Sequence, residues 1–160
     1  RVLPGVVRYG RWLGCRTEHD AKDVLQEVFI KAYVHLRSYD ADLAFSSWIY
    51  RICHNETMSW FRKQRVRPQA AGSEEELFAL ESLADPRDFV EGIEQNVDRA
   101  RLTKAMEGLR EDYRDVLVLR FFEEKSYQEI GDILQKPPGT VATLLNRAKA
   151  QLATLLASHV

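Results

Sequence analysis

The residue types best suited to chemistry in this chain are cations and aromatic rings mixed together between positions 50 and 67. The members are Tyr50, Arg51, His54, Phe61, Arg62, Lys63, Arg65 and Arg67. Cations neutralise phosphates and rings stack on unpaired bases, with about 1–3 kcal/mol for each stacked base. The mixture therefore predicts a surface for single-stranded nucleic acid. A helix end that carries Lys and Arg only to suit its dipole is the alternative.

Patterns for catalysis or metal binding are missing from the sequence. The four histidines have no HxxxH spacing, and neither cysteine stands at a metal-ligand spacing. Cys53 and His54 are neighbours, so on a helix their side chains point about 100° apart and cannot act as nucleophile and base. There is also no Gly-rich phosphate loop and no GxSxG sequence. We therefore predict a protein that is not an enzyme, with no catalytic residue, metal or cofactor.

The elements that position these residues are expected to be helices. β-Branched residues never alternate over a useful length, whereas 3.6-residue spacing recurs along the chain, so the fold class is predicted to be all-α. The sequence has no long apolar run and no charged-then-apolar leader, so we expect no membrane insertion. The two cysteines are expected to stay reduced in a cytoplasmic, disulfide-free protein.

Charge divides the chain of 160 residues into three parts. Residues 1–67 carry 12 Lys and Arg against 7 Asp and Glu, whereas residues 68–95 carry 1 against 8 and residues 96–160 carry 10 against 9. The middle part opens with Pro, Gly, Ser and a run of carboxylates, which is typical of a linker. We predict two small helical domains, 1–67 and 96–160, joined by an acidic linker, 68–95.

A first helix is predicted from Asp20 to Leu36, where apolar residues recur at helical spacing. The expected core face comprises Val24, Leu25, Val28, Phe29, Ala32 and Leu36. The opposite face comprises Asp23, Gln26, Glu27, Ile30 and Val34. Carboxylates, an amide and aliphatic side chains together suit a protein partner. A second buried side within a helical bundle is the alternative.

The mixed cations and rings belong to a second predicted helix, from Ser46 to Arg65, with Ser46 or Ser47 as its N-cap. The expected core stripe of this helix is Trp48, Ile49, Ile52, Cys53 and Trp60. Most of the rings and cations then lie on the other side of the helix, where a nucleic acid could reach them.

The later part of the chain predicts helices at about 100–109 and 113–122, followed by two further helices joined by a tight turn. Ser126 and Glu129 form a capping box that fixes the start of the third helix. The residues of this helix expected to point inward are Tyr127, Ile130 and Leu134. A Gln-Lys-Pro-Pro stretch ends it, and Thr140 is expected to cap the fourth.

These last two helices are predicted to form a helix-turn-helix. The expected buried stripe of its second helix is Val141, Leu144, Leu145, Ala148 and Leu152. Thr143, Asn146 and Arg147 project from the other side, where such side chains can contact base edges in a major groove. An αα-corner without DNA binding is the alternative.

Four motifs stand out along the chain: Asp23-Val-Leu-Gln-Glu-Val-Phe29, Phe45-Ser-Ser-Trp-Ile-Tyr-Arg-Ile-Cys-His-Asn55, Ser126-Tyr-Gln-Glu-Ile-Gly131, and Gly139-Thr-Val141 with Asn146-Arg-Ala148. In this order they resemble the motifs of extracytoplasmic-function sigma factors. The match covers both halves of the chain and leaves only the linker unmatched. The resemblance implies a bacterial, non-catalytic subunit that brings RNA polymerase to promoters and initiates transcription.

The resemblance also implies a partner for each set of residues. Residues matching the surface that binds the clamp of the polymerase's largest subunit are Asp23, Gln26, Glu27, Ile30 and Val34. Residues matching the segment that opens and contacts the minus-ten element are Tyr50, Arg51, His54, Asn55, Phe61, Arg62, Lys63 and Arg65. Residues matching the minus-thirty-five contacts are Arg120, Gly139, Thr140, Thr143, Asn146 and Arg147. The loop Tyr39–Phe45 is similar to one that captures a flipped base, and the polymerase flap and an anti-sigma protein are implied as further partners.

Four positions depart from the family's usual pattern. Ala142 and Leu144 stand where basic residues are common, Gln135 where a turn glycine is frequent, and Gly131 where alanine is. Two contacts to phosphate or bases are then missing, so the second domain is expected to bind its element weakly or with unusual preference. Leu144 could contact a protein partner instead.

Two other classes of protein stay open on the sequence alone. One is a helix-turn-helix transcription regulator that binds duplex DNA without polymerase, against which the aromatic and basic helix argues. The other is a sigma-like interaction adaptor without promoter activity, which Ala142 and Leu144 favour.

Overall fold

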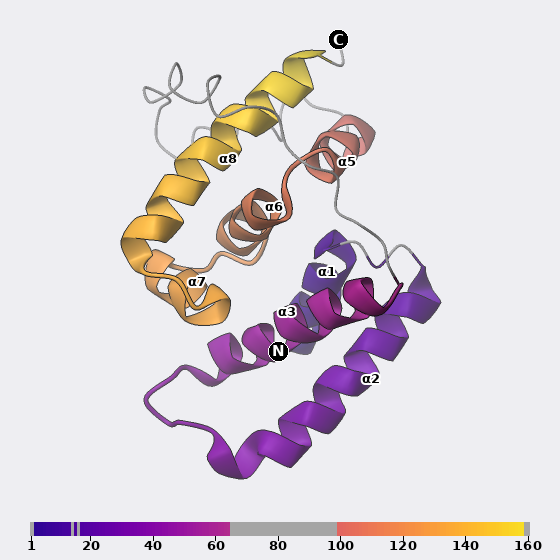
Figure 1. Cartoon of the computed structure of the whole chain (residues 1–160), viewed down its shortest axis with the longest axis vertical. Helices are drawn as coiled ribbons and strands as arrows, with labels where there is room; N and C mark the ends of the chain where they lie inside the picture. The colour runs from indigo at the N-terminus through magenta and orange to yellow at the C-terminus, as the bar shows by residue number, and fades with distance from the viewer. Residues whose placement is uncertain (1, 14, 16, 65–98, 159–160) are drawn as a thin grey trace.

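The computed structural model describes residues 2–13, 15, 17–64 and 99–158, so the acidic linker lies outside the described residues. Within these ranges every regular element is a helix, which confirms the all-α prediction (Figure 1). No helix in the described part is long and apolar enough to cross a membrane. The helices form two units that pack against each other.

The first unit contains α1 (Leu3–Leu13), α2 (Glu18–His35) and α3 (Phe45–Gln64), with the short 3-10 helix η1 (Leu36–Ser38) before the loop to α3. Thr17 begins α2 through a capping box, because its hydroxyl accepts from the Asp20 amide while the Asp20 carboxylate accepts from the Thr17 amide. Residues at the centre of this unit include Val6, Tyr9, Leu13, Val24, Val28 and Cys53.

The predicted caps of α3 are wrong. The Trp48 amide donates to the Ala44 carbonyl, so the helix begins at Phe45 and both Ser46 and Ser47 lie inside its first turn. Ser47 is fully buried. A serine whose side chain faces the core from within the helix cannot satisfy the free amides at the helix start.

The predicted core face of α2 is correct only in its first half. Val24 and Val28 are buried, but Phe29 is 51% exposed and Leu36 is 52% exposed. The buried residues of α2 end at Val28. Beyond that point α2 and α3 diverge toward the loop that joins them (Figure 1). Helical spacing therefore continues in the sequence after the packed part of the helix has ended.

The second unit contains α5 (Arg99–Glu107), α6 (Glu111–Leu117), the π-helical segment η3 (Val118–Phe122), α7 (Tyr127–Leu134) and α8 (Pro138–Ser158). The long α8 packs against α5, α6 and α7. Residues buried in this unit include Val116, Leu117, Leu119, Ile130, Ile133, Val141, Leu145, Ala148 and Leu152, most of which helical spacing predicted.

Helices α7 and α8 form the predicted helix-turn-helix. The Ser126 hydroxyl accepts from the Glu129 amide and the Glu129 carboxylate accepts from the Ser126 amide, which confirms the capping box. Thr140 is not the cap of α8, because the helix already begins at Pro138. Proline suits that first position, since the N–H it lacks would have no acceptor within the helix.

Candidate nucleic-acid interface

The exposed side of α8 carries the three side chains predicted to contact bases. Thr143, Asn146 and Arg147 are all exposed and lie opposite the buried stripe of the helix. The Thr143 hydroxyl donates to the Gly139 carbonyl at 3.1 Å, which leaves its oxygen as an acceptor. Gly139 and Thr140 are exposed at the helix start. The polar groups needed for base edges and phosphates therefore lie on one helix.

Arg120, in η3, supports the turn before α7. Its guanidinium donates to the Lys125 carbonyl at 2.9 Å, and its Cζ lies 5.3 Å from the centre of the Tyr127 ring. Arginine has five N–H donors, so these contacts leave others for a phosphate. The described contacts thus give Arg120 a structural role, and its contact with DNA stays a prediction.

The eight residues predicted on α3 for the minus-ten element are divided between solvent and the second unit. The exposed members are Asn55, Arg62 and Lys63. The members that lie against the second unit are Tyr50, Arg51 and His54. Phe61 is half-buried beside Trp60, with ring centroids 5.2 Å apart. Arg65 lies outside the described residues.

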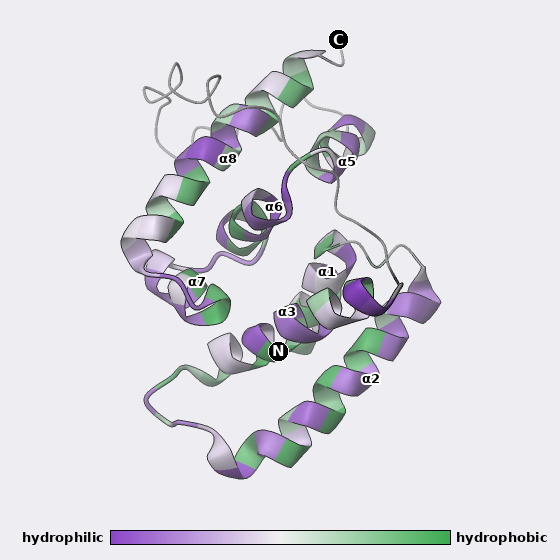
Figure 2. Cartoon of the chain, in the orientation of Figure 1, coloured by the Kyte–Doolittle hydropathy of each residue, from purple (hydrophilic) through white to green (hydrophobic). Residues whose placement is uncertain are grey.

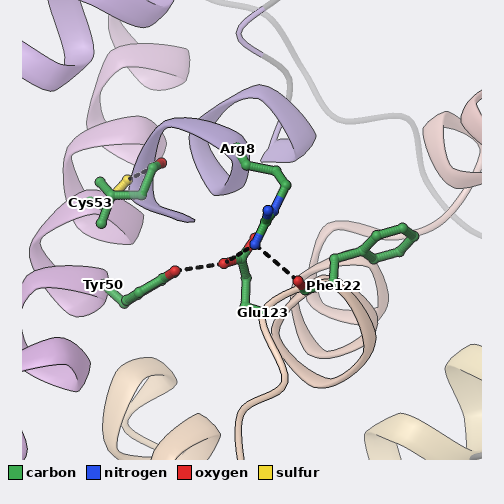
Figure 3. A network of polar contacts seen from close by, with 6 residues as sticks. Arg8, Tyr50, Cys53, Phe122 and Glu123 are labelled. Carbon is green, nitrogen blue, oxygen red and sulfur yellow. Dashed lines mark hydrogen bonds and ion pairs between the residues drawn. The ribbon is translucent and has the colours of Figure 1, made fainter. Parts of the chain in front are cut away.

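Glu123, directly after η3, joins the two units (Figure 3). The Arg8 guanidinium from α1 donates to its carboxylate at 2.6 and 3.0 Å and to the Phe122 carbonyl at 3.1 Å. The Tyr50 hydroxyl from α3 donates to the same carboxylate at 2.6 Å. Because the Glu123 side chain is only 2% exposed, these donors replace the water that the carboxylate has lost. We call Arg8, Tyr50 and Glu123 the latch.

Two further contacts from the second unit cover predicted DNA-binding residues of α3. The Arg51 Nε donates to the Asp132 carbonyl of α7 at 2.7 Å, and the Lys125 ammonium lies 4.6 Å from the centre of the Tyr50 ring. Tyr50 is only 4% exposed, and its pKa is raised by burial and by its hydrogen bond to Glu123, so the hydroxyl keeps its proton. In this closed arrangement the second unit occupies part of the surface predicted for the minus-ten element.

The residues predicted to bind polymerase are all exposed on α2: Asp23, Gln26, Glu27, Ile30 and Val34. Phe29 and Tyr33 add to this surface, with 51% and 82% of each residue exposed. The predicted core position of Phe29 is therefore wrong. Tyr33, three residues after Ile30, has no role in the sequence prediction, although its spacing places it on the same face. Figure 2 shows hydrophobic and hydrophilic residues mixed along this helix. We call Phe29, Ile30, Tyr33 and Val34 the apolar patch, which suits a protein partner.

An aromatic cluster holds the loop between η1 and α3. The rings of Tyr39, Phe45 and Trp48 have centroids 5.0–5.6 Å apart. The Tyr39 hydroxyl donates to the Leu43 carbonyl. Phe45 remains 47% exposed, so a ring supported by two others faces solvent. Such a ring is suited to stacking on an unpaired base.

Neither cysteine has the environment of a nucleophile. Both are buried as free thiols, and burial raises the pKa of Cys15 to about 11 and the pKa of Cys53 to about 12. A thiolate is therefore scarce at neutral pH. Within the described residues no group of three or more His, Cys, Asp or Glu side chains could hold a metal ion.

Comparison with known proteins identifies the family. The Sigma-70 region 2 family matches residues 1–67, and the Sigma-70 region 4 family matches residues 99–152. The ECF RNA polymerase sigma factor SigW of Bacillus subtilis is 37% identical over 142 residues, which cover 84% of this chain and 74% of that protein. The chain belongs to the ECF sigma factors. This sigma factor is also 36% identical to the ECF RNA polymerase sigma-E factor of Escherichia coli K12 over 137 residues, 81% of this chain and 70% of that protein.

The family assignment decides between the functions that the sequence left open. A sigma factor directs RNA polymerase to promoters, so a polymerase-independent regulator and an adaptor without promoter activity are not favoured. Solved structures agree on the fold. The sigma factor RpoE in complex with the anti-sigma factor NepR, from Bartonella quintana, matches with a TM-score of 0.70 and 22% identity over 98% of this chain and 92% of that one. CnrH in complex with the cytosolic domain of CnrY matches with a TM-score of 0.69 and 24% identity over 98% and 82%.

Proposed function

We propose that this sigma factor contacts the minus-thirty-five element through α8, the minus-ten element through α3 and core RNA polymerase through α2. The observation that carries the proposal is the exposure of Thr143, Asn146 and Arg147 on one face of a capped helix-turn-helix. Their hydroxyl, amide and guanidinium groups are the kinds that contact base edges. The amides of Gly139 and Thr140, at the start of the same helix, suit a phosphate.

The face of α2 is the proposed docking surface for the clamp of the largest polymerase subunit. It joins the carboxylates of Asp23 and Glu27 to the apolar patch, so both charge and apolar area are available to a partner. The flap region of the polymerase is the proposed partner of the second unit.

Strand opening is the proposed task of α3. Asn55, Arg62 and Lys63 are exposed, so they can meet DNA in the arrangement described. Tyr50 and Arg51 can do so only after the second unit moves away from α3. The exposed ring of Phe45, beside this helix, is the proposed support for an unpaired base.

The remaining features of the proposal concern the whole protein. We place it in the bacterial cytoplasm as a non-catalytic subunit without a cofactor, built from domains 1–67 and 96–160 and an acidic linker, 68–95. An anti-sigma protein is a proposed partner, since the similar Bartonella quintana sigma factor was solved with one.

Run-off transcription with core polymerase tests the division of labour between α3 and α8. Asn55→Ala is expected to lose activity on duplex templates and to regain it on a template already melted at the minus-ten element. Arg147→Ala is expected to weaken promoter binding by about 1–3 kcal/mol, the contribution of one good base contact, on both templates.

The control for Arg147→Ala is Thr154→Ala, an exposed position two turns farther along α8, which is expected to transcribe normally. Loss of activity by Asn55→Ala on both templates alike would contradict a role in opening. Normal activity of Arg147→Ala would contradict the role of α8 in promoter binding.

A further inference from the structure

A buried carboxyl and a buried imidazole meet where the two units touch. Asp115 of α6 is 3% exposed, and its Oδ2 lies 3.6 Å from Nδ1 of His54 on α3. The Tyr9 hydroxyl of α1 lies 3.1 Å from the same His54 nitrogen. The other oxygen of Asp115, Oδ1, has no hydrogen-bond partner among the described residues. An ionised carboxylate in this position would lose water without full replacement, so the neutral acid is the favoured form.

The charges around Asp115 do not reverse this preference. Burial raises its pKa, and the carboxylates of Glu111 and Asp112 on the same helix raise it further, against the opposing cations Arg114 and Lys136. The Arg114 guanidinium donates to three backbone carbonyls, those of Met106, Glu107 and Leu109. From the first unit, the titratable groups that face the carboxyl are Tyr9 and His54. Helix α8, which also packs against α6, has one buried charged residue among its described positions, Lys149.

The imidazole of His54 is also neutral in the closed arrangement. Burial, together with the nearby Lys136 ammonium, lowers its pKa to about 4. Burial raises the pKa of Tyr9, so its hydroxyl keeps a proton that it can donate to Nδ1. Above about pH 4 the closed pair therefore holds one proton, on Asp115.

We propose that closing of the two units takes up one proton, which the Asp115 and His54 pair holds where the units meet, so that alkaline conditions open the molecule. Separation of α6 from α1 and α3 removes His54 and Tyr9, the two first-unit groups beside the carboxyl, and is proposed to let water reach both Asp115 and His54. In water the pKa of histidine is about 6.5 and that of aspartate about 3.9.

The pH range of the effect follows from counting protons. Between about pH 4 and 6.5 both arrangements hold one proton, on Asp115 when closed and on His54 when open, so closure is independent of pH. Above about pH 6.5 the open pair holds none while the closed pair still holds one. The ratio of closed to open molecules then falls by up to about tenfold for each unit of pH, until the closed carboxyl ionises as well.

Opening would expose Tyr50, Arg51 and His54 on α3. An effect of this exposure on promoter binding rests on the function proposed for α3. Closure itself does not, because it can be measured without polymerase or DNA. A pH-dependent radius and a failed transcription assay would therefore be separate results.

Small-angle X-ray scattering of the whole chain between about pH 4 and 9 tests the proposal, with circular dichroism to show that the helices persist. The radius of gyration is expected to stay constant up to about pH 6.5 and then to increase. Asp115→Asn, which keeps the shape of the acid but cannot ionise, is expected to show no increase in radius above about pH 6.5. Below about pH 6.5 only its open form takes up a proton, on His54, so this variant is expected to open toward acid instead. Glu107→Gln, which removes an exposed carboxylate of the second unit that does not act on Asp115 or His54, is the control and is expected to follow the unmodified chain.

His54→Gln provides a second test that does not depend on how well Asp115→Asn folds. Without the histidine proton of the open form, opening is expected to begin near pH 4 instead of near pH 6.5. A radius independent of pH in the unmodified chain would overturn the proposal. So would opening of Asp115→Asn in step with the unmodified chain, or an unchanged onset in His54→Gln.

Discussion

Gln135 ends α7 in a left-handed backbone conformation, with φ at 55°. This conformation costs a residue with a Cβ roughly 1–2 kcal/mol, whereas glycine adopts it freely. The steric demand in this turn falls elsewhere, at Gly131, where a Cβ would lie 2.6 Å from the Lys136 carbonyl oxygen. Position 131 therefore requires glycine, while position 135 tolerates a side chain at an energetic cost.

Replacing Gln135 should therefore stabilise the protein. Gln135→Gly is expected to raise the free energy of unfolding by about 0.5–1 kcal/mol, because relief of the left-handed strain exceeds the entropy that glycine adds to the unfolded chain. Urea denaturation followed by circular dichroism measures the change. Gln135→Ala keeps the Cβ and is expected to give no gain, so equal stability of the two variants would contradict the explanation.

The apolar patch of α2 shows how an element can be well formed and still incomplete. The helix is capped at Thr17 and packed through Val28, yet Ile30 is 48% exposed and Val34 is 64% exposed one turn apart. Burial of this apolar surface by a partner would release a favourable free energy that the free helix does not have. The stability of the helix and its binding to polymerase should therefore respond separately to substitution.

The double substitution Ile30→Ser with Val34→Ser tests that separation. Binding to core polymerase is expected to weaken by about 2 kcal/mol or more, which is over tenfold, since two partly exposed aliphatic side chains would no longer be buried. Thermal unfolding is expected to change little. Lys22→Ser, at a 69% exposed side chain near the start of α2 that pairs with Glu18 outside the proposed surface, is the control and should bind normally. Unchanged polymerase binding by the double variant would remove α2 from the proposed interface.

The sequence predicted those elements that depend on neighbouring residues. The capping box at Ser126 and the stop at Gln135 involve residues within a few positions of one another, and both are confirmed. The predicted stripe of α8 is buried as well, except at Leu144, which is only partly buried. Periodicity could not show where packing on α2 ends, because an apolar face has the same spacing whether or not another helix covers it. The assignment of Phe29 to the core was wrong for that reason.

The contact between the two units could not be predicted from the sequence, because it joins residues that are far apart along the chain. Arg8 and Glu123 are 115 positions apart, and nothing local in either segment indicates their pairing. Tyr50 is an example. Its ring could stack on a base, and its hydroxyl could equally well donate to a carboxylate, as it does to Glu123. The function of α3 as a DNA surface could be proposed from the sequence, but its partial burial in the closed arrangement could not.

At the scale of the whole molecule, closure depends on a close approach at Gly5 of α1. A Cβ there would lie 2.0 Å from the Tyr50 hydroxyl oxygen and 2.8 Å from the Glu123 carboxylate. At Gly10, on the same helix, no atom of the described residues beyond the neighbouring helix backbone lies within 4 Å of the place where a Cβ would be. Alanine favours a helix over glycine by roughly 0.5–1 kcal/mol at either position, so a comparison of the two substitutions isolates the contact with the latch.

Gly5→Ala is expected to open the molecule and Gly10→Ala to leave it closed. The added methyl group displaces Tyr50 from Glu123, and a hydrogen bond to a charged group contributes about 1.5–3 kcal/mol, so the ratio of closed to open molecules should fall at least tenfold. Scattering near pH 6 would then give a larger radius for Gly5→Ala alone. If both variants stay equally compact, the latch does not hold the units together. If Gly5→Ala opens, it should also bind single-stranded DNA more tightly than Gly10→Ala, because Tyr50 and Arg51 are then exposed. The packing of one glycine would in this way control the exposure of the proposed DNA surface.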